Sequence, residues 1–281
     1  MPERVSIVIC TRDRGAALRA TLERYGVLGH DPDWELIVVN DGSRDGTAEL
    51  LAGQQRHDQR LTVVTTDGVG LGAARNAGWR AATGPLVLFT DDDCYPDPEL
   101  LDGIRTCLAV PGVHFVGGRL LPYTRADAAV AVVMRTNRVA VAPRSFVPAG
   151  LLPGANLTVR RSALEAVGGF DPEFGAGTPF PAEDVELVAR LAANGFAGAF
   201  DPGPVVYHHH DRRSDQDVDR LRRLYDRGRG AYYAKCLADP RLRWTYLRAW
   251  CRLTWKGSWR RAGRELAGAV GYWTRSGGGR R

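Results

Sequence analysis

The sequence predicts an α/β fold with a single Rossmann-type, mostly parallel sheet flanked by helices, followed by a helical C-terminal extension. Three observations lead to this prediction. Short apolar runs alternate with segments of helical spacing over the first 110 residues. The length of 281 residues suits one large domain, or one domain with an appendage. After residue 210 the composition changes, and arginines and tryptophans become frequent.

The first half alternates between strands and helices in a regular order. The apolar runs are rich in β-branched residues and bounded by turn formers, as in strands that are covered on both faces. Strands are expected at 5–10, 35–40, 61–66 and 85–90, and helices at 16–25, 48–56 and 72–82. A further helix is expected with Asp97 as N-cap and Pro98 at its first position. Such a sheet binds its ligands at the carboxyl ends of its strands.

The second half is less regular. The segment 154–170 is expected to hold a strand and then a short helix, with Ser162 and Glu165 at capping-box spacing and Gly168-Gly169 at its end. The segment 182–196 is predicted to be a helix closed by Asn194-Gly195. The segment 203–210 reads as a short strand that runs into three histidines.

Three consecutive carboxylates, Asp91, Asp92 and Asp93, follow the strand at 85–90. Two unit charges about 4 Å apart repel by about 4 kcal/mol at an effective dielectric of 20, so the cluster needs either full solvation or a cation. One interpretation is a solvated acidic loop. The other is a site for Mg²⁺ or Mn²⁺, which prefer oxygen ligands and commonly bridge phosphates.

Other polar residues follow neighbouring strands on the same rim. Thr11, Arg12 and Asp13 come after the first strand, and Asp41 comes after the second. The segment "NDGSRDGT" is a good turn in its own right, because Asp, Gly and Ser favour turns. Beside the other loops of this rim, a nucleoside pocket is the alternative, in which Asp41 accepts a hydrogen bond from a base N–H.

Two further groups can carry chemistry. Arg75 and Asn76 lie in a helical pattern after the Gly-rich "DGVGLGAARNAG", which lacks the Lys of a Walker loop. Arg75 is therefore either a ligand-binding or a surface arginine. Glu183 and Asp184 open a helix, where acidic side chains complement the helix dipole or supply a general base at a pocket mouth.

The three histidines at 208–210 lie at a strand end. Successive strand residues point to opposite faces, so at most two of the three can face one site. Either His208 or His210 can supply an imidazole to a metal, and strand parity does not choose between them. The alternative is a run of surface histidines.

Taken together, these segments resemble glycosyltransferase family 2, whose members share the GT-A fold. The resemblance covers about residues 4–210 and depends on six motifs in the order of the family: "VSIVICTRDR", "ELIVVNDGSRDGT", "GLGAARNAG", "LVLFTDDDC", "GANLTVRRSALEAVGGFDPEFG" and "AEDVELVARLAANGF". The fourth resembles the DXD motif of the family, and the sixth its ED base.

The resemblance implies an inverting transferase that moves a sugar from a nucleoside diphosphate sugar to an acceptor hydroxyl, with a UDP-sugar as the preferred donor. The acceptor would be a glycan, a lipid-linked molecule or a small molecule, and Mn²⁺ or Mg²⁺ would be the cofactor. Roles follow residue by residue. They are Thr11, Arg12, Asp13 and Asp41 for the nucleotide base and its loop; Arg75, Asn76, Asp91 and Asp92 for the rest of the donor; Asp93, Asp91 and His208 for the metal; and Asp184 for the catalytic base, beside Glu183.

Two other functions stay open. A nucleotidyltransferase also uses carboxylates, a metal and a nucleotide, but it would need a Gly-rich phosphate loop with a lysine, and residues 1–210 contain no lysine. A non-catalytic module that binds sugar nucleotides or glycans would have no need of both acidic motifs. Activity assays distinguish these from a transferase.

Charge divides the chain into an acidic body and a basic tail. Residues 1–210 are expected to form the catalytic domain, with a nucleotide-sugar half at 1–110 and an acceptor half at 111–210. Residues 211–281 carry 19 Lys and Arg against 7 Asp and Glu, and five of the seven tryptophans. Within 241–264, Trp244, Trp255 and Trp259 can share a helical stripe. That stripe either packs on the body or lies on an anionic membrane, while a nucleic-acid partner is not expected.

Five cysteines without a CxxC pair favour a reducing compartment. The chain enters a strand within its first five residues and holds no apolar run of about 20 residues, so neither a signal peptide nor a membrane span is expected. A cytoplasmic location, with peripheral contact at the inner face of the membrane, is the resulting expectation.

Overall fold

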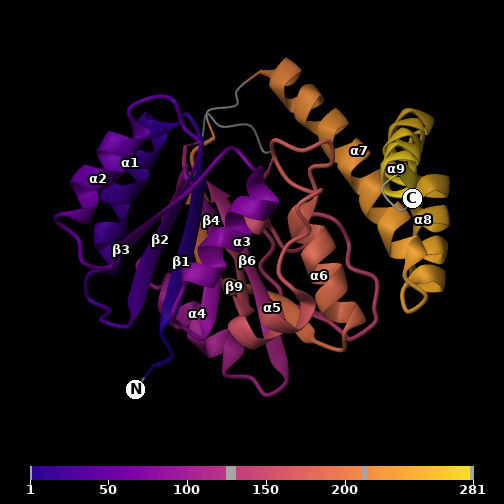
Figure 1. Cartoon of the computed structure of the whole chain (residues 1–281). Helices are drawn as coiled ribbons and strands as arrows, with labels where there is room; N and C mark the ends of the chain where they lie inside the picture. The colour runs from indigo at the N-terminus through magenta and orange to yellow at the C-terminus, as the bar shows by residue number, and fades with distance from the viewer. Residues whose placement is uncertain (1, 125–130, 211–213, 279–281) are drawn as a thin grey trace.

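The computed structural model describes residues 2–124, 131–210 and 214–278. Figure 1 shows a twisted sheet through the middle of the molecule, with helices beside it and the helices of the extension gathered at one side. Among the described residues, no helix has both the length and the apolar character to cross a bilayer.

Within the described ranges the strands form one sheet, in the order β3-β2-β1-β4-β8-β6-β9-β5, with β7 paired to β9. The strands are β1 (Val5–Thr11), β2 (Trp34–Asp41), β3 (Leu61–Thr66), β4 (Leu86–Asp91), β5 (Cys94–Pro96), β6 (Val113–Pro122), β7 (Val139–Val141), β8 (Leu157–Arg160) and β9 (Ala197–His208).

The sheet is parallel from β3 to β4, as the alternating pattern predicts. The registers Val5↔Trp34 and Val5↔Leu86 align the three central strands, so that they end together at Thr11, Asp41 and Asp91. Beyond β4, strand β8 is antiparallel to both of its neighbours, and β6 pairs with β9 in parallel. One edge of the sheet therefore collects the candidate site residues.

The helices also follow the expected order. They are α1 (Gly15–Arg24), α2 (Thr47–Gln55), α3 (Leu71–Ala81), α4 (Leu100–Leu108), α5 (Arg161–Val167), α6 (Glu183–Ala193), α7 (Asp215–Ala238), α8 (Arg243–Lys256) and α9 (Trp259–Gly278), with 3-10 turns at Tyr25–Leu28 and Gly154–Asn156.

Two expected helix caps are wrong. Helix α4 begins at Leu100, and Asp97 instead accepts the Glu99 N–H at 3.0 Å in a turn before the helix. Ser162 lies inside α5, whose N-cap is Arg160 without a side-chain cap, so Ser162 and Glu165 form no capping box. The end of α5 is as expected, because Gly168 takes a left-handed conformation with φ 77° that a glycine adopts without strain.

The two faces of the sheet carry separate cores, as strand parity requires. Val5, Ile7 and Ile9 of β1 point into the core with α1, α2 and α4, whereas Val8 points into the core with α3, α5 and α6. The same alternation recurs along β2 and β4. These apolar runs are buried on both faces, which is why the sequence shows them as nearly continuous.

A third core joins the extension to the body. Phe174, Phe180 and Val185 pack with aromatic residues of α7, α8 and α9, among them Tyr232 and Tyr246. The expected tryptophan stripe takes no part, since Trp244, Trp255 and Trp259 are all exposed. The interpretation that this stripe packs on the body is therefore wrong. The division of the chain at residue 210 stays a prediction.

Candidate functional site

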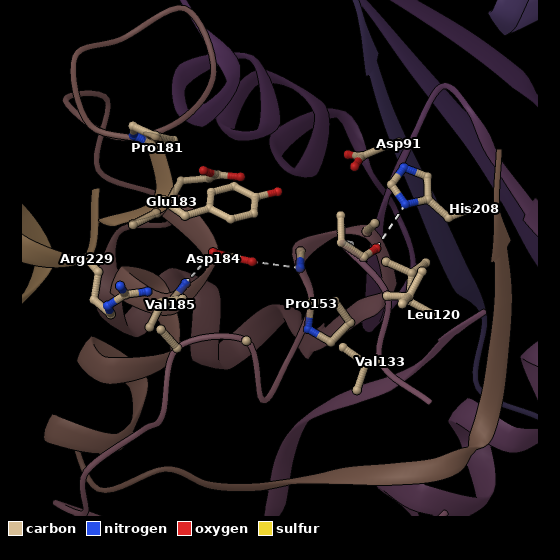
Figure 2. Close-up of a pocket in the computed structure, with 18 of the residues that line it drawn as sticks. Asp91, Leu120, Val133, Pro153, Pro181, Glu183, Asp184, Val185, His208 and Arg229 are labelled. Atoms are coloured by element: carbon tan, nitrogen blue, oxygen red, sulfur yellow. Dashed lines mark hydrogen bonds between the residues drawn. The ribbon is translucent and has the colours of Figure 1, made fainter. Parts of the chain in front are cut away.

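Two adjoining cavities lie at the edge where β1, β2 and β4 end. The larger, with a volume of about 590 Å³, is lined by Thr11, Arg12, Asp41 and the three aspartates of the turn after β4. The smaller, of about 350 Å³, is lined by Asp184, Pro153, Arg229 and other residues of the second half. Asp91, Glu183 and His208 line both. Figure 2 shows Asp91 and His208 across the smaller cavity from Glu183 and Asp184.

The acidic turn begins where β4 ends and returns as β5, so its three carboxylates take different directions. Asp92 is buried, accepts the Thr11 hydroxyl at 2.6 Å, and lies 2.9 Å from Nε of Arg14. Burial raises the pKa of Asp92 to about 6, against the opposing effects of the Arg14 charge and the Thr11 hydrogen bond. Asp92 is therefore a buried anchor between β1 and the turn rather than an open ligand.

Asp93 points to the end of β9. Its Oδ1 lies 3.2 Å from His208 Nε2, and its Oδ2 accepts from Arg14 at 2.6 Å. Burial acts to raise the pKa of Asp93, but the hydrogen bond and charge of His208, together with Arg14, lower it to about 2. The pKa of His208 is raised, because the contact with Asp93 outweighs the burial of the ring.

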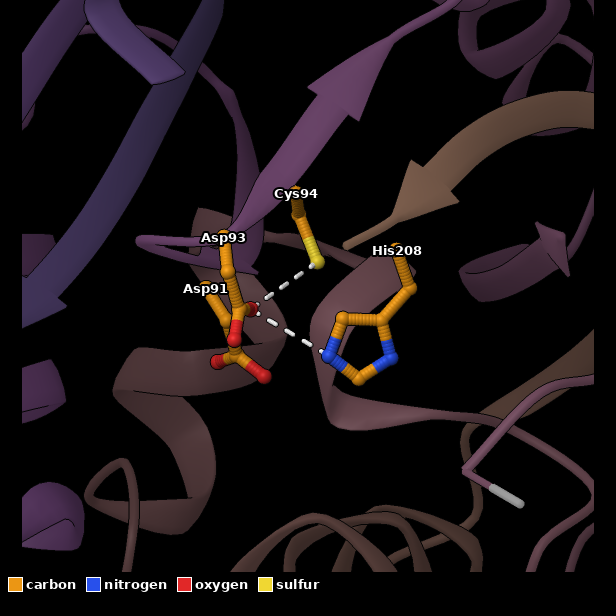
Figure 3. Close-up of side chains that lie close together, drawn as sticks. All are labelled: Asp91, Asp93, Cys94 and His208. Carbon is orange, nitrogen blue, oxygen red and sulfur yellow. Dashed lines mark hydrogen bonds and ion pairs between the residues drawn. The ribbon is translucent and has the colours of Figure 1, made fainter. Parts of the chain in front are cut away.

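The structure brings together a set of side chains that fits a divalent cation. One ligand atom from each of Asp91, Asp93, Cys94 and His208 lies within 4.8 Å of the others (Figure 3). Burial raises the pKa of Cys94 well above its usual value, which disfavours the thiolate form in which cysteine binds metals. The carboxylates and imidazole that remain suit Mn²⁺ or Mg²⁺ better than a thiophilic metal.

Between the two histidines that strand parity left open, His208 faces this set. Its Nδ1 is 3.1 Å from the carbonyl oxygen of Ala131, which leaves Nε2 toward Asp93. His210 packs against the His208 ring at 5.0 Å between centroids. His209 lies on another side of the strand, where its Nδ1 is 2.9 Å from the Tyr95 hydroxyl.

Arg75 is buried below the junction of the two cavities. Its guanidinium donates to Glu183 at 2.8 Å, to Asp91 at 3.0 Å and to the carbonyl oxygen of Gly154 at 3.3 Å. It is thus no surface arginine. It joins a carboxylate of the acidic turn to one of the ED pair, and its contact with a nucleotide stays a prediction.

Asp41 and the residues after β1 shape the rim of the larger cavity. Asp41 accepts hydrogen bonds from the Thr66 hydroxyl and from the backbone N–H groups of Val69 and Gly70, at 2.7, 2.8 and 3.0 Å. It thereby fixes the Gly-rich loop in front of α3. Arg12 lies exposed on the same rim beside Gly68.

Two predicted site residues do not line either cavity. Asp13 is exposed and accepts the backbone N–H of Arg44 at 2.6 Å. Asn76 is buried, and its amide donates to the Phe170 carbonyl at 2.7 Å and accepts the Phe170 N–H at 2.8 Å. Asp13 thus connects the loops after β1 and β2, and Asn76 connects α3 to the segment after α5.

Glu183 and Asp184 begin α6, as expected, and differ in their partners. Glu183 is held by Arg75, whereas Asp184 accepts the backbone N–H of Gly154 at 2.8 Å and of Val185 at 2.7 Å. Burial raises the pKa of Glu183 to about 7, and it raises the pKa of Asp184 as well. Asp184 is therefore an oriented carboxylate with raised basicity on the wall of the smaller cavity.

Sequence reasoning missed three groups. Arg14 neutralises the acidic turn, and the only sequence signal is its place in "TRDRG" beside Asp13. Cys94 adjoins the metal set directly after the three aspartates. Tyr225, Arg229 and Tyr232 of α7 line the smaller cavity, although α7 belongs to the segment expected to be a separate extension.

Known proteins resemble this chain in sequence and in fold. The family model described as glycosyl transferase family 2 matches residues 6–168. The pre-mycofactocin glycosyltransferase of Mycobacterium tuberculosis is 28% identical over 215 residues, which are 73% of this chain and 43% of that protein. The chain spans 27% to 50% of the lengths of three other curated relatives that it matches.

Two solved structures share the fold. The mannosyltransferase PcManGT of Pyrobaculum calidifontis, in complex with GDP-Man and Mn²⁺, has a TM-score of 0.65 and 22% identity over 96% of this chain and 80% of that chain. TarS 1–349 of S. aureus, in complex with UDP-GlcNAc, has a TM-score of 0.65 and 16% identity over 94% and 79% of the two chains. With a family model that covers more than half of its length, the chain belongs to glycosyltransferase family 2 and has the GT-A fold.

Proposed function

We propose that the chain transfers a sugar from a nucleoside diphosphate sugar to an acceptor hydroxyl, with inversion at the anomeric carbon. UDP is the nucleotide that we prefer for the donor. The observation that carries this proposal is the junction of the two cavities. A set of cation ligands lies on one side of it, and the oriented carboxylate of Asp184 lies on the other. The acceptor is a glycan, a lipid-linked molecule or a small molecule.

The larger cavity holds the donor. Asp41 has three hydrogen-bond donors in place, and a carboxylate offers about four lone-pair sites, which leaves one direction for a base N–H. Thr11 and Arg12 lie on the same rim. Related structures carry either a uracil or a guanine nucleotide, so they do not choose the base. We prefer UDP because the segment around Asp41 resembles the uracil-binding turn of the family.

Asp91, Asp93 and His208 hold Mn²⁺ or Mg²⁺ in this proposal. When bound, the cation neutralises the negative charge that develops on the departing diphosphate. Arg14 and Arg75 flank the same region and supply positive charge from the protein itself. Arg75 is buried and Arg14 is held in place by two carboxylates, and positioned cations of this kind stabilise a leaving phosphate with little reorganisation.

Asp184 accepts the proton of the acceptor hydroxyl. Gly154 N–H and Val185 N–H hold its carboxylate toward the smaller cavity, and burial raises its pKa toward the working range of a base. Glu183 is paired with Arg75 and positions that guanidinium instead. A hydroxyl that attacks from this side approaches the sugar opposite the leaving diphosphate, which inverts the configuration.

The first experiment replaces Asp184 by Asn. We expect donor binding to stay within about twofold and turnover to fall at least about 100-fold, the lower range for a lost acid–base residue. Calorimetry with UDP-sugars and Mn²⁺, beside a single-turnover assay, measures both. Asp102→Asn, an exposed carboxylate of α4, is the matched control.

Two outcomes would contradict the proposal. Full turnover by Asp184→Asn would remove this residue from the role of base. Donor binding without transfer or hydrolysis by the unaltered chain, over a panel of acceptor hydroxyls, would indicate a binding module. A thermal-shift screen of UDP, dTDP and GDP with and without Mn²⁺ ranks the bases, since a ligand at about 100 times its Kd adds about 2.7 kcal/mol of stability.

A further inference from the structure

The helices α8 and α9 carry exposed apolar and basic side chains that nothing in the described chain covers. We call it the Trp–Arg surface. It comprises Trp244, Arg248, Arg252 and Trp255 of α8 and Trp259, Arg260, Leu266, Val270 and Trp273 of α9.

Two tryptophans mark the turn between the helices. Trp255 is the last-but-one residue of α8 and Trp259 is the first of α9, and they are 91% and 90% exposed. Tryptophan is a large, mainly apolar side chain that is usually well buried in a folded protein. A pair that projects almost completely from one turn is an exposed apolar patch that needs a partner.

The apolar residues of α9 continue this patch along the helix. At 3.6 residues per turn, positions 259, 266, 270 and 273 fall within about 60° of one another. Leu266, Val270 and Trp273 are exposed by about half. Ala269 and Tyr272, which belong to the third core, occupy a different face that packs toward the body. Helix α9 therefore has two apolar faces. One packs toward the body, and the other is exposed.

Charge indicates what covers the open face. Residues 241–275 contain nine Lys and Arg and a single acidic residue, Glu265. Arg261 and Arg264 use their charge internally, on Glu265 and Asp226. By contrast, Arg248, Arg252 and Arg260 are exposed, and among the described residues no carboxylate lies within ion-pair distance of them.

We propose that the Trp–Arg surface docks the chain on an anionic lipid bilayer, with Trp255 and Trp259 at the level of the headgroups. Exposed tryptophans and arginines on one helical face are the combination that lies in a membrane interface, where the rings leave water and the guanidinium groups meet anionic headgroups. A second copy in a two-fold dimer would bring this basic face against itself, which like charges oppose.

Helix α7 connects the proposed docking surface to the smaller cavity. Helix α7, which packs against α9, also supplies Tyr225 and Arg229 to the smaller cavity. The bilayer-docked helices are thus directly connected to the wall of the site where the acceptor is proposed to enter. The docking itself does not depend on the transferase activity, because it needs neither donor nor turnover.

Co-sedimentation of the full chain with vesicles tests the proposal. The vesicles consist of phosphatidylcholine alone or with about 30% phosphatidylglycerol, an anionic lipid of the kind that attracts basic segments. We expect binding to the anionic vesicles that is at least about tenfold stronger than to the neutral ones. It should weaken between 0.1 M and 1 M salt, over which the Debye length falls from about 10 Å to about 3 Å.

Two pairs of variants separate the apolar and the charged contributions. Trp255→Ala/Trp259→Ala and Arg252→Gln/Arg260→Gln alter exposed side chains only, so the melting temperature should stay unchanged, and each pair should lower vesicle binding at least about tenfold. Arg19→Gln/Arg56→Gln removes two exposed arginines from the body and serves as the charge-matched control, with binding unchanged.

Three results would overturn the proposal. They are equal sedimentation with neutral and anionic vesicles, wild-type binding by both paired variants, and a loss of binding by the Arg19/Arg56 control as large as theirs. Sedimentation velocity can give a fourth result that would overturn the proposal. A dimer that dissociates in Trp255→Ala/Trp259→Ala would show that a second copy covers this face instead.

Discussion

The acidic turn after β4 is balanced by cations of the chain itself. Arg14 contacts both Asp92 and Asp93, and His208 contacts Asp93 from the other side. This arrangement explains how three adjacent carboxylates persist beside a buried strand, where unbalanced repulsion would be costly. It also means that any cation that binds there competes with Arg14 for the oxygens of Asp93.

Replacing Arg14 by Gln tests this balance at the residue scale. We expect Mn²⁺ to bind several-fold more tightly in the absence of donor, because a positive charge next to the ligands is removed. Donor affinity at saturating Mn²⁺ should fall, because the larger cavity loses a cation. Electron paramagnetic resonance titration of Mn²⁺ measures the first effect and calorimetry the second.

Arg12→Gln is the control for Arg14, since Arg12 lies on the same rim but contacts neither Asp92 nor Asp93 among the ion pairs of the described residues. Its Mn²⁺ affinity should match that of the unaltered chain. Weaker Mn²⁺ binding in Arg14→Gln would show that Arg14 organises the ligand set instead of competing with the cation.

The pH dependence of turnover is a second prediction at this scale. Asp184 must be ionised to accept a proton, and burial raises its pKa above the usual value of 3.8. Activity should therefore be present above the pKa of Asp184 in the folded chain and should be lost as the pH falls through it. The fall in kcat should begin at a higher pH than it would for an aspartate of ordinary pKa. A pH profile of single-turnover rates measures this limb, and a rate still flat down to pH 3.8 would contradict it.

At the scale of elements, strands were the most predictable part of the molecule. Runs such as 5–10 and 85–90 match β1 and β4 within a residue, because burial on both faces leaves an unbroken apolar signal. The caps of α4 and α5 were not predictable, because local capping residues compete with turns that the sheet imposes. The role of α7 in the smaller cavity was likewise hidden, since it depends on tertiary packing and leaves no spacing signal.

Glycines set the close approach of α7 and α9. A Cβ on Gly230 would lie 1.8 Å from the backbone oxygen of Glu265, a distance at which backbone has to move. Gly230→Ala should therefore lower the free energy of unfolding by about 1–3 kcal/mol through overpacking. Urea denaturation measures the change.

The matched control for Gly230 lies in α9 itself. A Cβ on Gly263 would meet no heavy atom within 4 Å, so Gly263→Ala should stabilise the chain by up to about 1 kcal/mol through helix propensity. Equal effects of the two substitutions would show that α7 and α9 do not pack closely.

At the scale of the whole molecule, the active-site region and the extension depend on each other. The third core takes Phe174 and Phe180 from the loop that borders the larger cavity and buries them against Tyr232 and Tyr272. An ion-pair cluster of Asp226, Arg229 and Glu265 joins α7 to α9 at the smaller cavity. We therefore predict that the charge step in the sequence marks a change of surface rather than the edge of a separately folded unit.

This dependence predicts the behaviour of a chain cut after residue 210. Such a chain would expose Phe174, Phe180 and Val185, and each large apolar side chain contributes about 1.5–3 kcal/mol when it is buried. We expect it to bind a hydrophobic dye, to unfold at a lower temperature and to lose donor affinity. Trp255→Ala/Trp259→Ala, which alters the extension without touching this core, should show none of these changes. A monomeric 1–210 chain with an unchanged melting temperature and full donor binding would instead establish residues 1–210 as an independent domain.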